Sequence, residues 1–188
     1  DVGYVSKEAE QLAKRAFDVF HQARQQVTIF DHVHPVLSEL SQSYRLAALT
    51  NGNADVSIIG LDRYFEFALS ADSVGRQKPD PTMFLIALER AKVKAEETIH
   101  IGDHPVDDIV GAHNAGLHTI WVNFESLPWS HEPTSAGGGA PSAKAAPSEK
   151  LVPAEKVART EKVAPTEIAN CLSEIPKLIS QIANGLCK

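Results

Sequence analysis

The feature that most constrains this chain is the stretch IHIGDHPVDD at residues 99–108. Its first residues read as a short apolar strand, which ends at Gly102 and Asp103. Asp107 and Asp108 follow at the start of a predicted helix. Carboxylates at the end of a buried strand are unfavourable unless a cation lies close to them, and carboxylate with water is the ligand set that suits Mg²⁺. The alternative is that Asp107 and Asp108 only stabilise the helix N-terminus through its dipole.

Short apolar strands alternate with helices along the chain. The pattern predicts strands over residues 45–50, 67–70, 98–102 and 117–122. It predicts helices from Pro81 onward and over residues 107–115. Such alternation is typical of a three-layer α/β fold, in which helices cover both faces of a parallel sheet. Ligands of these folds bind at the carboxyl ends of the strands.

The first of these strands ends in three small polar residues, Thr50, Asn51 and Gly52. A hydroxyl group and exposed backbone N–H groups at the end of a strand form a cradle for an oxyanion. A plain Asn-Gly turn is the alternative interpretation. The cradle is favoured because other polar residues follow other strands of the same predicted sheet.

Lys78 lies in the polar loop that follows the second strand, directly before Pro79. Pro79 favours an extended backbone at Lys78, and most lysines in such loops are simply solvated. The carboxyl ends of parallel strands, however, meet at one edge of a sheet. We therefore expect Lys78 to converge with Thr50 and Asp103 on one crevice.

The sequence pattern divides the chain into four regions. Residues 1–30 hold one long amphipathic helix, predicted over residues 6–26, whose apolar face needs a partner. Residues 31–134 hold the alternating strands and helices. Residues 135–164 contain several copies of a six-residue repeat, such as PSEKLV and PAEKVA. The prolines and the scarcity of apolar side chains in these copies predict a flexible insertion. Residues 165–188 supply a final short strand and a closing helix.

Charge and composition narrow the possible partners. The formal net charge of −6 argues against a nucleic-acid surface, and no run of Lys and Arg suggests a membrane patch. No apolar run approaches the ~20 residues of a membrane helix, and the first residues do not read as a signal peptide. Cys171 and Cys187 match no metal-binding spacing and are typical of thiols in a reducing cytoplasm. We expect a cytoplasmic monomer or homodimer that binds a small molecule and neither nucleic acid nor membrane.

Three of these stretches together resemble the haloacid dehalogenase (HAD) superfamily of phosphohydrolases. Residues 49–52 (LTNG) resemble its second motif, and residues 78–81 (KPDP) resemble its third. Gly102 and Asp103, with Asp108, resemble its fourth. The order, the spacing and the position of each motif after a predicted strand also fit this family.

The resemblance implies a three-layer Rossmann-like HAD core with a parallel sheet over residues 31–134 and 165–188. It assigns residues 1–30 to the C-terminal part of a helical cap domain. It implies a Mg²⁺-dependent phosphatase that hydrolyses a small phosphorylated metabolite, a phosphomonoester, through an aspartyl-phosphate. Thr50 would hydrogen-bond the phosphoryl group, together with the N–H groups of Asn51 and Gly52. Lys78 would neutralise the charge that phosphate and nucleophile share.

The same resemblance places the metal at the fourth motif. Asp103 would ligate Mg²⁺, directly or through water, and Asp108 would support that site from the helix start. Asp107 satisfies a shorter form of the spacing, but the residues after Asp108 match the usual helix of the family better. Residues 23–27 (ARQQV) and 100–105 (HIGDHP) are similar to the bacterial subgroup with a helical cap, subfamily I, that includes FMN and riboflavin-precursor phosphatases. FMN or a riboflavin-pathway phosphate is therefore a candidate substrate.

The sequence departs from the family at the first motif, an Asp-x-Asp after an apolar strand that supplies the nucleophile and the general acid. The nearest stretch, residues 31–35 (DHVHP), lacks the second carboxylate. We expect that the chain begins inside a longer protein, whose front holds the central strand, the nucleophile and much of the cap. Alone, the chain should be inactive. The alternatives are a metal-independent dehalogenase, a phosphosugar mutase of the same fold, and a non-catalytic remnant or binding module.

Overall fold

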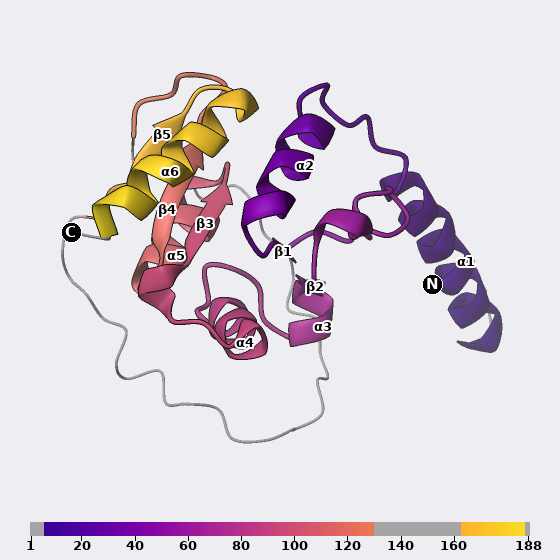
Figure 1. The fold of residues 1–188 in the computed structure, drawn as a ribbon. Coiled ribbons are helices and arrows are strands. Elements are labelled where there is room, and N and C mark those ends of the chain that lie inside the picture. Colours follow the sequence, from indigo (N-terminus) through magenta and orange to yellow (C-terminus); the bar gives the residue numbers. More distant parts are fainter. Residues whose placement is uncertain (1–5, 130–162, 187–188) are drawn as a thin grey trace. The chain divides into compact units, whose positions relative to one another are not determined.

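The computed structural model describes residues 6–129 and 163–186. It divides into two compact units, Asp1–Ser70 and Ala71–Lys188, and each holds a sheet of its own (Figure 1). All but the last two residues of the predicted insertion over 135–164 lie outside the described residues. The predicted boundaries of cap, core and insertion therefore stay predictions.

The first unit contains two helices and a two-stranded parallel sheet. Its elements are α1 (Ser6–Arg24), α2 (Val33–Ser43), β1 (Ala47–Thr50), a 3₁₀ turn (Asp62–Tyr64) and β2 (Phe67–Ser70). The strands pair in register from Ala47 with Phe67 to Thr50 with Ser70, so both end at the same edge. α1 confirms the helix predicted over 6–26, and it ends two residues earlier.

The second unit contains a three-stranded parallel sheet in the order β3-β4-β5. Its helices and strands are α3 (Ala71–Val74), α4 (Thr82–Ala91), β3 (Ile99–Gly102), a π-helical segment (Pro105–Val110), α5 (Gly111–Asn114), β4 (His118–Val122), β5 (Glu167–Ala169) and α6 (Ile175–Leu186). Two 3₁₀ turns complete it, Ala95–Glu97 and Leu172–Glu174. In the middle strand β4, Trp121 pairs with Gly102 on one side and Ile168 on the other.

The core of the second unit surrounds β4. Ile120 and Trp121 of that strand are buried, and α4 contributes Met83 and Phe84 with no exposed surface. The apolar face of α6 adds Ile175, Ile179 and Ile182, which recur at helical spacing and are buried. This core fixes β3 and the segment after it, which carry the fourth motif.

The α/β class is confirmed, since helices and strands alternate and the strand pairs β1–β2, β3–β4 and β4–β5 are all parallel. The prediction was a single parallel sheet, but the described strands form two sheets, β1-β2 and β3-β4-β5. The sheets are separate because no strand among the described residues pairs with both β1 and β3. Over the same ranges, no helix has the length and apolar character needed to cross a membrane.

The helical segment after β3 differs from its prediction in where it begins. It starts at Pro105 and not at Asp107, because the fixed φ of Pro105 suits a first helical turn. The side chain of His104 caps that turn, with Nδ1 accepting the N–H of Asp107 at 3.0 Å. Gly116 follows the helix with a φ of 88°, which agrees with its predicted terminating role.

Candidate active site

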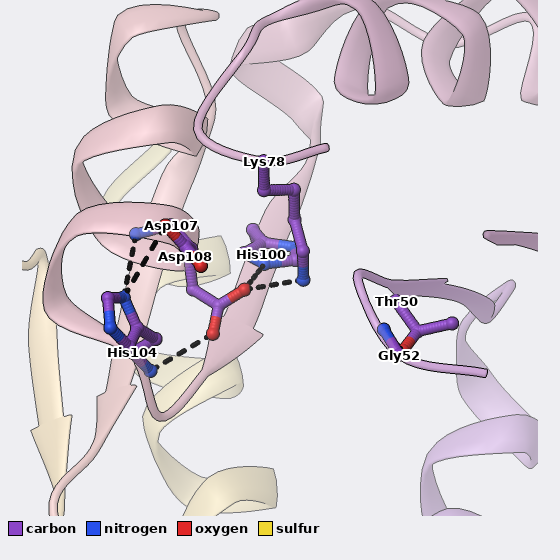
Figure 2. Close-up of polar contacts among 7 residues, drawn as sticks. All are labelled: Thr50, Gly52, Lys78, His100, His104, Asp107 and Asp108. Atoms are coloured by element: carbon purple, nitrogen blue, oxygen red, sulfur yellow. Dashed lines mark hydrogen bonds and ion pairs between the residues drawn. The ribbon is translucent and has the colours of Figure 1, made fainter. Parts of the chain in front are cut away.

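Lys78 and Asp108 form a buried ion pair in the second unit (Figure 2). Nζ of Lys78 lies 2.6 Å from Oδ1 of Asp108, and the two side chains are only 8% and 7% exposed. Lys78 comes from the loop before α4, and Asp108 comes from the π-helical segment after β3. Removing two charges from water is costly unless both gain hydrogen bonds, so a pair buried this deeply requires further partners.

The Asp108 carboxylate accepts three hydrogen bonds. Oδ1 accepts from Nζ of Lys78 and from Nε2 of His100 at 3.1 Å, and Oδ2 accepts from the backbone N–H of His104 at 3.0 Å. Burial by itself raises the pKa of Asp108. The hydrogen bond from His100 and the charge of Lys78 outweigh burial and hold this pKa well below its ordinary value. Asp108 is therefore an anion whose two oxygens already have partners within the chain.

The close approach of Asp108 to β3 explains the glycine of the Gly-Asp motif. A Cβ atom built on Gly102 would overlap the side chain of Asp108. Any other residue at position 102 would therefore displace the carboxylate from Lys78. The absence of a side chain at Gly102 is what allows the strand end and the helix start to share this space.

His100 is a site residue that the sequence analysis missed. It lies on β3 between two isoleucines, its side chain is 11% exposed, and its ring packs edge-on against Phe84 with centroids 5.0 Å apart. A carboxylate can only accept hydrogen bonds, so Nε2 of His100 carries the proton in its bond to Asp108. A histidine inside an apolar strand was the available signal, because a buried polar group needs a partner.

Asp103 and Asp107 have more accessible side chains than Asp108. The carbonyl of Asp103 accepts a hydrogen bond from Nε1 of Trp121 at 2.9 Å, which fixes the backbone just beyond β3. The carboxylate of Asp107 lies 3.7 Å from Nδ1 of His104. Asp103 thus offers an exposed carboxylate at the edge of the sheet.

These carboxylates fit a Mg²⁺ site in part. Mg²⁺ usually binds proteins through one or two carboxylates and keeps several waters, and Asp103 provides an exposed carboxylate of that kind. Both oxygens of Asp108 already accept hydrogen bonds, so its predicted role in metal binding stays a prediction. Across residues 6–129 and 163–186, no group of three or more His, Cys, Asp or Glu side chains could hold a metal ion.

Thr50 ends β1 in the first unit, and the loop after it folds back on its hydroxyl group. The N–H of Gly52 donates to Oγ1 of Thr50 at 2.9 Å (Figure 2). Because Oγ1 accepts this bond, the hydroxyl hydrogen can be donated to a ligand. The loop thus forms a local turn that occupies the N–H of Gly52, and the predicted oxyanion cradle at this strand end stays a prediction.

The structure brings together some of the predicted site residues and leaves others in separate units. Lys78 and Asp108 are in direct contact, and Asp103 precedes Asp108 by five residues, all within the second unit. Thr50 and Asn51 lie in the first unit. The predicted convergence of all these residues on one crevice stays a prediction.

Comparison with known families gives a match whose range contains all of the candidate site residues. Residues 3–122 match the family described as Haloacid dehalogenase-like hydrolase. The matched range covers more than half of the chain and includes Thr50, Lys78 and Asp108.

Two curated relatives are phosphatases by name. The 5-amino-6-(5-phospho-D-ribitylamino)uracil phosphatase YigB of Escherichia coli is 35% identical over 126 residues, which cover 67% of this chain and 53% of that protein. The phosphoserine phosphatase of Thermus thermophilus is 32% identical over 121 residues, which cover 61% of this chain and 49% of that protein. The chain therefore spans about half the length of these relatives.

Two solved structures of similar fold are named as a haloacid dehalogenase and as a HAD-hydrolase. A 2-haloacid dehalogenase from Pseudomonas syringae pv. Tomato superposes with a TM-score of 0.77 and 39% identity, over 95% of this chain and 65% of that chain. The HAD-hydrolase YfnB of Bacillus subtilis, bound to magnesium, superposes with a TM-score of 0.59 and 25% identity, over 80% of this chain and 55% of that chain.

Proposed function

Because the chain belongs to the haloacid dehalogenase-like hydrolase family, we propose that it is part of a Mg²⁺-dependent phosphatase acting on a small phosphomonoester. The single observation that carries this proposal is the buried pair of Lys78 and Asp108. Phosphoryl transfer requires little besides positioning and charge neutralisation, and a lysine held in place by a buried carboxylate supplies both. The names of two curated relatives support the same reaction class.

In this proposal Asp108 acts through Lys78. Its carboxylate holds the ammonium group in place, and His100 holds the carboxylate in turn. The positive charge of Lys78 would offset the charge on a phosphoryl oxygen as it develops. By the resemblance, Thr50 would donate its hydroxyl hydrogen to a phosphoryl oxygen, together with the backbone N–H of Asn51.

Asp103 is the described residue that would hold Mg²⁺, either directly or through a water molecule. When bound there, the ion would neutralise phosphate charge and orient the substrate. A magnesium-bound relative, YfnB, supports this assignment by analogy. Water and the substrate phosphate would supply further ligands, as is usual for Mg²⁺.

The nucleophile is proposed to come from outside the printed sequence. No two aspartates of this chain are separated by a single residue, so the Asp-x-Asp pattern is absent. The chain alone should therefore not turn over a phosphomonoester. Within the substrate class, FMN or a riboflavin-pathway phosphate is favoured by the similarity to YigB, whose name specifies a ribitylaminouracil phosphate.

A p-nitrophenyl phosphate assay with Mg²⁺ tests these points. We expect no turnover by the chain alone, and turnover by a longer protein that carries an Asp-x-Asp strand ahead of residue 1. That activity should disappear in excess EDTA and in Lys78→Ala, whereas Lys94→Ala, which changes an exposed lysine, should retain it. Turnover by the chain alone that Lys78→Ala abolishes would contradict the missing nucleophile, and full activity in EDTA would contradict the metal assignment.

A metal-independent dehalogenase is the second candidate, because the similar structure from Pseudomonas syringae bears that name. The same longer protein can be offered 2-chloropropionate, with halide release as the readout. Release of halide in EDTA, without release of phosphate from p-nitrophenyl phosphate, would favour the dehalogenase. Transfer of phosphate between sugar positions without its release would favour a mutase instead.

A further inference from the structure

Arg24, the last residue of α1, lies beside the loop that follows β1. A Cβ atom built on Gly52 would lie 3.3 Å from Oγ1 of Thr50 and 3.9 Å from Nη2 of Arg24. The space that a side chain at Gly52 would fill is thus bounded by a hydroxyl group and a guanidinium group. Both belong to the first unit, so their closeness is independent of the second.

The neighbour of Arg24 fastens the end of α1 to the same loop. Nε2 of Gln25 donates to the carbonyl of Asn53 at 2.9 Å, and Oε1 of Gln25 accepts the N–H of Asp55 at 2.7 Å. One side-chain amide therefore bridges two residues of the loop. These two hydrogen bonds hold the end of α1, and with it Arg24, against the loop that contains Gly52.

Within the described part of the chain, Arg24 differs from Arg45 and Arg63, the other arginines near this sheet, in having no side-chain partner of the kind that they have. Arg45 is paired with Glu66, and Arg63 donates to the hydroxyl of Tyr64. Arg24 is exposed, and among the residues that the structure describes it has no carboxylate within ion-pair distance.

The acidic residue of the loop, Asp55, is engaged elsewhere. Its Oδ1 accepts the N–H of Ser57 at 2.8 Å, and these hydrogen bonds from Ser57 lower its pKa. Asp55 therefore closes a local turn of its own. The charge of Arg24 is left facing the side of Gly52 where the hydroxyl of Thr50 also lies.

We propose that Arg24 is a further phosphate-binding residue, whose guanidinium group contacts the same phosphoryl group as the hydroxyl of Thr50, in the space that Gly52 leaves open. The inference rests on the proposed phosphatase function and adds to it a cation supplied by helix α1. A guanidinium group is permanently charged and donates in a planar fork that matches two phosphate oxygens. Gly52 keeps the space open, because a methyl group there would lie against Oγ1 of Thr50.

A titration of the ¹⁵N-labelled chain with inorganic phosphate, followed by NMR, tests the proposal without requiring catalysis. In the wild type the amides of Asn51 and Gly52 should shift saturably. Arg24→Gln should weaken binding about tenfold, because a charge-assisted hydrogen bond is lost, and Arg24→Lys should fall between the two. Gly52→Ala should weaken it independently, since its added methyl group fills the same space. Arg15→Gln, an exposed arginine earlier on α1, is the matched control and should bind as the wild type does.

The outcomes of this titration distinguish a failure of the Arg24 proposal from a failure of the proposed phosphatase function. Wild-type affinity in Arg24→Gln, with the shift at Gly52 intact, would overturn the role of Arg24 and leave the phosphate cradle in place. No shift at Asn51 or Gly52 in the wild type would overturn both. If Arg24→Gln weakens 2-phosphoglycolate but not inorganic phosphate, Arg24 contacts the rest of the substrate and the proposal is wrong.

Discussion

The two units of this chain differ in where they keep their polar side chains. Among the described residues of Ala71–Lys188, four that are polar or charged are buried, Lys78, Asp108, Thr119 and Asn123. Of the residues that the structure describes in Asp1–Ser70, none with a polar side chain is buried. The polar geometry of the second unit is thus fixed inside a buried core, whereas that of the first is fixed by hydrogen bonds nearer the surface, such as those from Gln25 to the loop after β1.

Among the described residues, the large apolar side chains differ between the units in the same direction, with more of them buried in the second. The second unit packs Phe84, Ile120 and Trp121 into its core, but the first leaves several large apolar side chains of α1 exposed, Leu12, Phe17, Val19 and Phe20. Burial of apolar surface is the main source of folding free energy. The comparison indicates that the charged site rests on the better-packed unit, because a buried ion pair needs a rigid surrounding to offset its desolvation.

The contrast in packing is tested most directly by the same change, phenylalanine to alanine, made once in each unit. Phe84→Ala should lower the free energy of unfolding by about 3–5 kcal/mol, since Phe84 is fully buried and supports His100. Phe20→Ala, at a side chain 51% exposed, should change it by less than about 0.5 kcal/mol. Urea unfolding followed by circular dichroism measures both values. Similar losses for the two variants would contradict the contrast in packing.

Removal of the buried cation should have the next largest effect. Lys78→Met leaves Asp108 with His100 and the N–H of His104 alone, and we expect a loss of about 3 kcal/mol. Lys94→Met removes a cation of an exposed pair, with side chains 72% and 73% exposed, and should cost less than about 0.5 kcal/mol. Equal effects would show that the Lys78–Asp108 pair contributes nothing beyond a surface pair.

Acid should weaken the second unit through Asp108. The pKa of this carboxyl is lower in the folded chain than in the unfolded chain, where it is about 3.9. Its stabilising contribution is therefore complete above the unfolded value and is lost as the pH falls toward the folded value. Urea midpoints of the wild type should fall below about pH 4, and those of Asp108→Asn should fall less steeply. If the urea midpoints of the two proteins fell equally with pH, Asp108 would not be the source of the acid sensitivity.

The smallest expected effect tests the loop of the first unit. Gln25→Ala removes the two bonds to the residues Asn53 and Asp55 and should cost about 1 kcal/mol, because the amide is only partly buried. Hydrogen exchange should accelerate at the N–H of Asp55. Gln22→Ala, one turn earlier on α1 and exposed, is the control and should leave that exchange rate unchanged.

Some site residues could be located from the sequence and others could not. Gly102 and Asp108 were found because a strand that ends in Gly-Asp and leads into a helix is a local pattern. His100 was missed, since its role depends on an oxygen of Asp108 that reaches back across Gly102. Arg24 was read only as part of a family stretch, because its position beside Gly52 follows from contacts between distant segments.

The sequence by itself determined the α/β class, the strand ends and the residue types placed after them, because these depend on periodicity and on turn chemistry over a few residues. It also determined that no Asp-x-Asp pattern is present. The tertiary structure alone decided that the carboxylate oxygens of Asp108 accept hydrogen bonds from Lys78, His100 and the backbone N–H of His104. Hydrogen-bond partners are chosen by packing in three dimensions, and no spacing along the chain specifies which donors will reach one buried carboxylate.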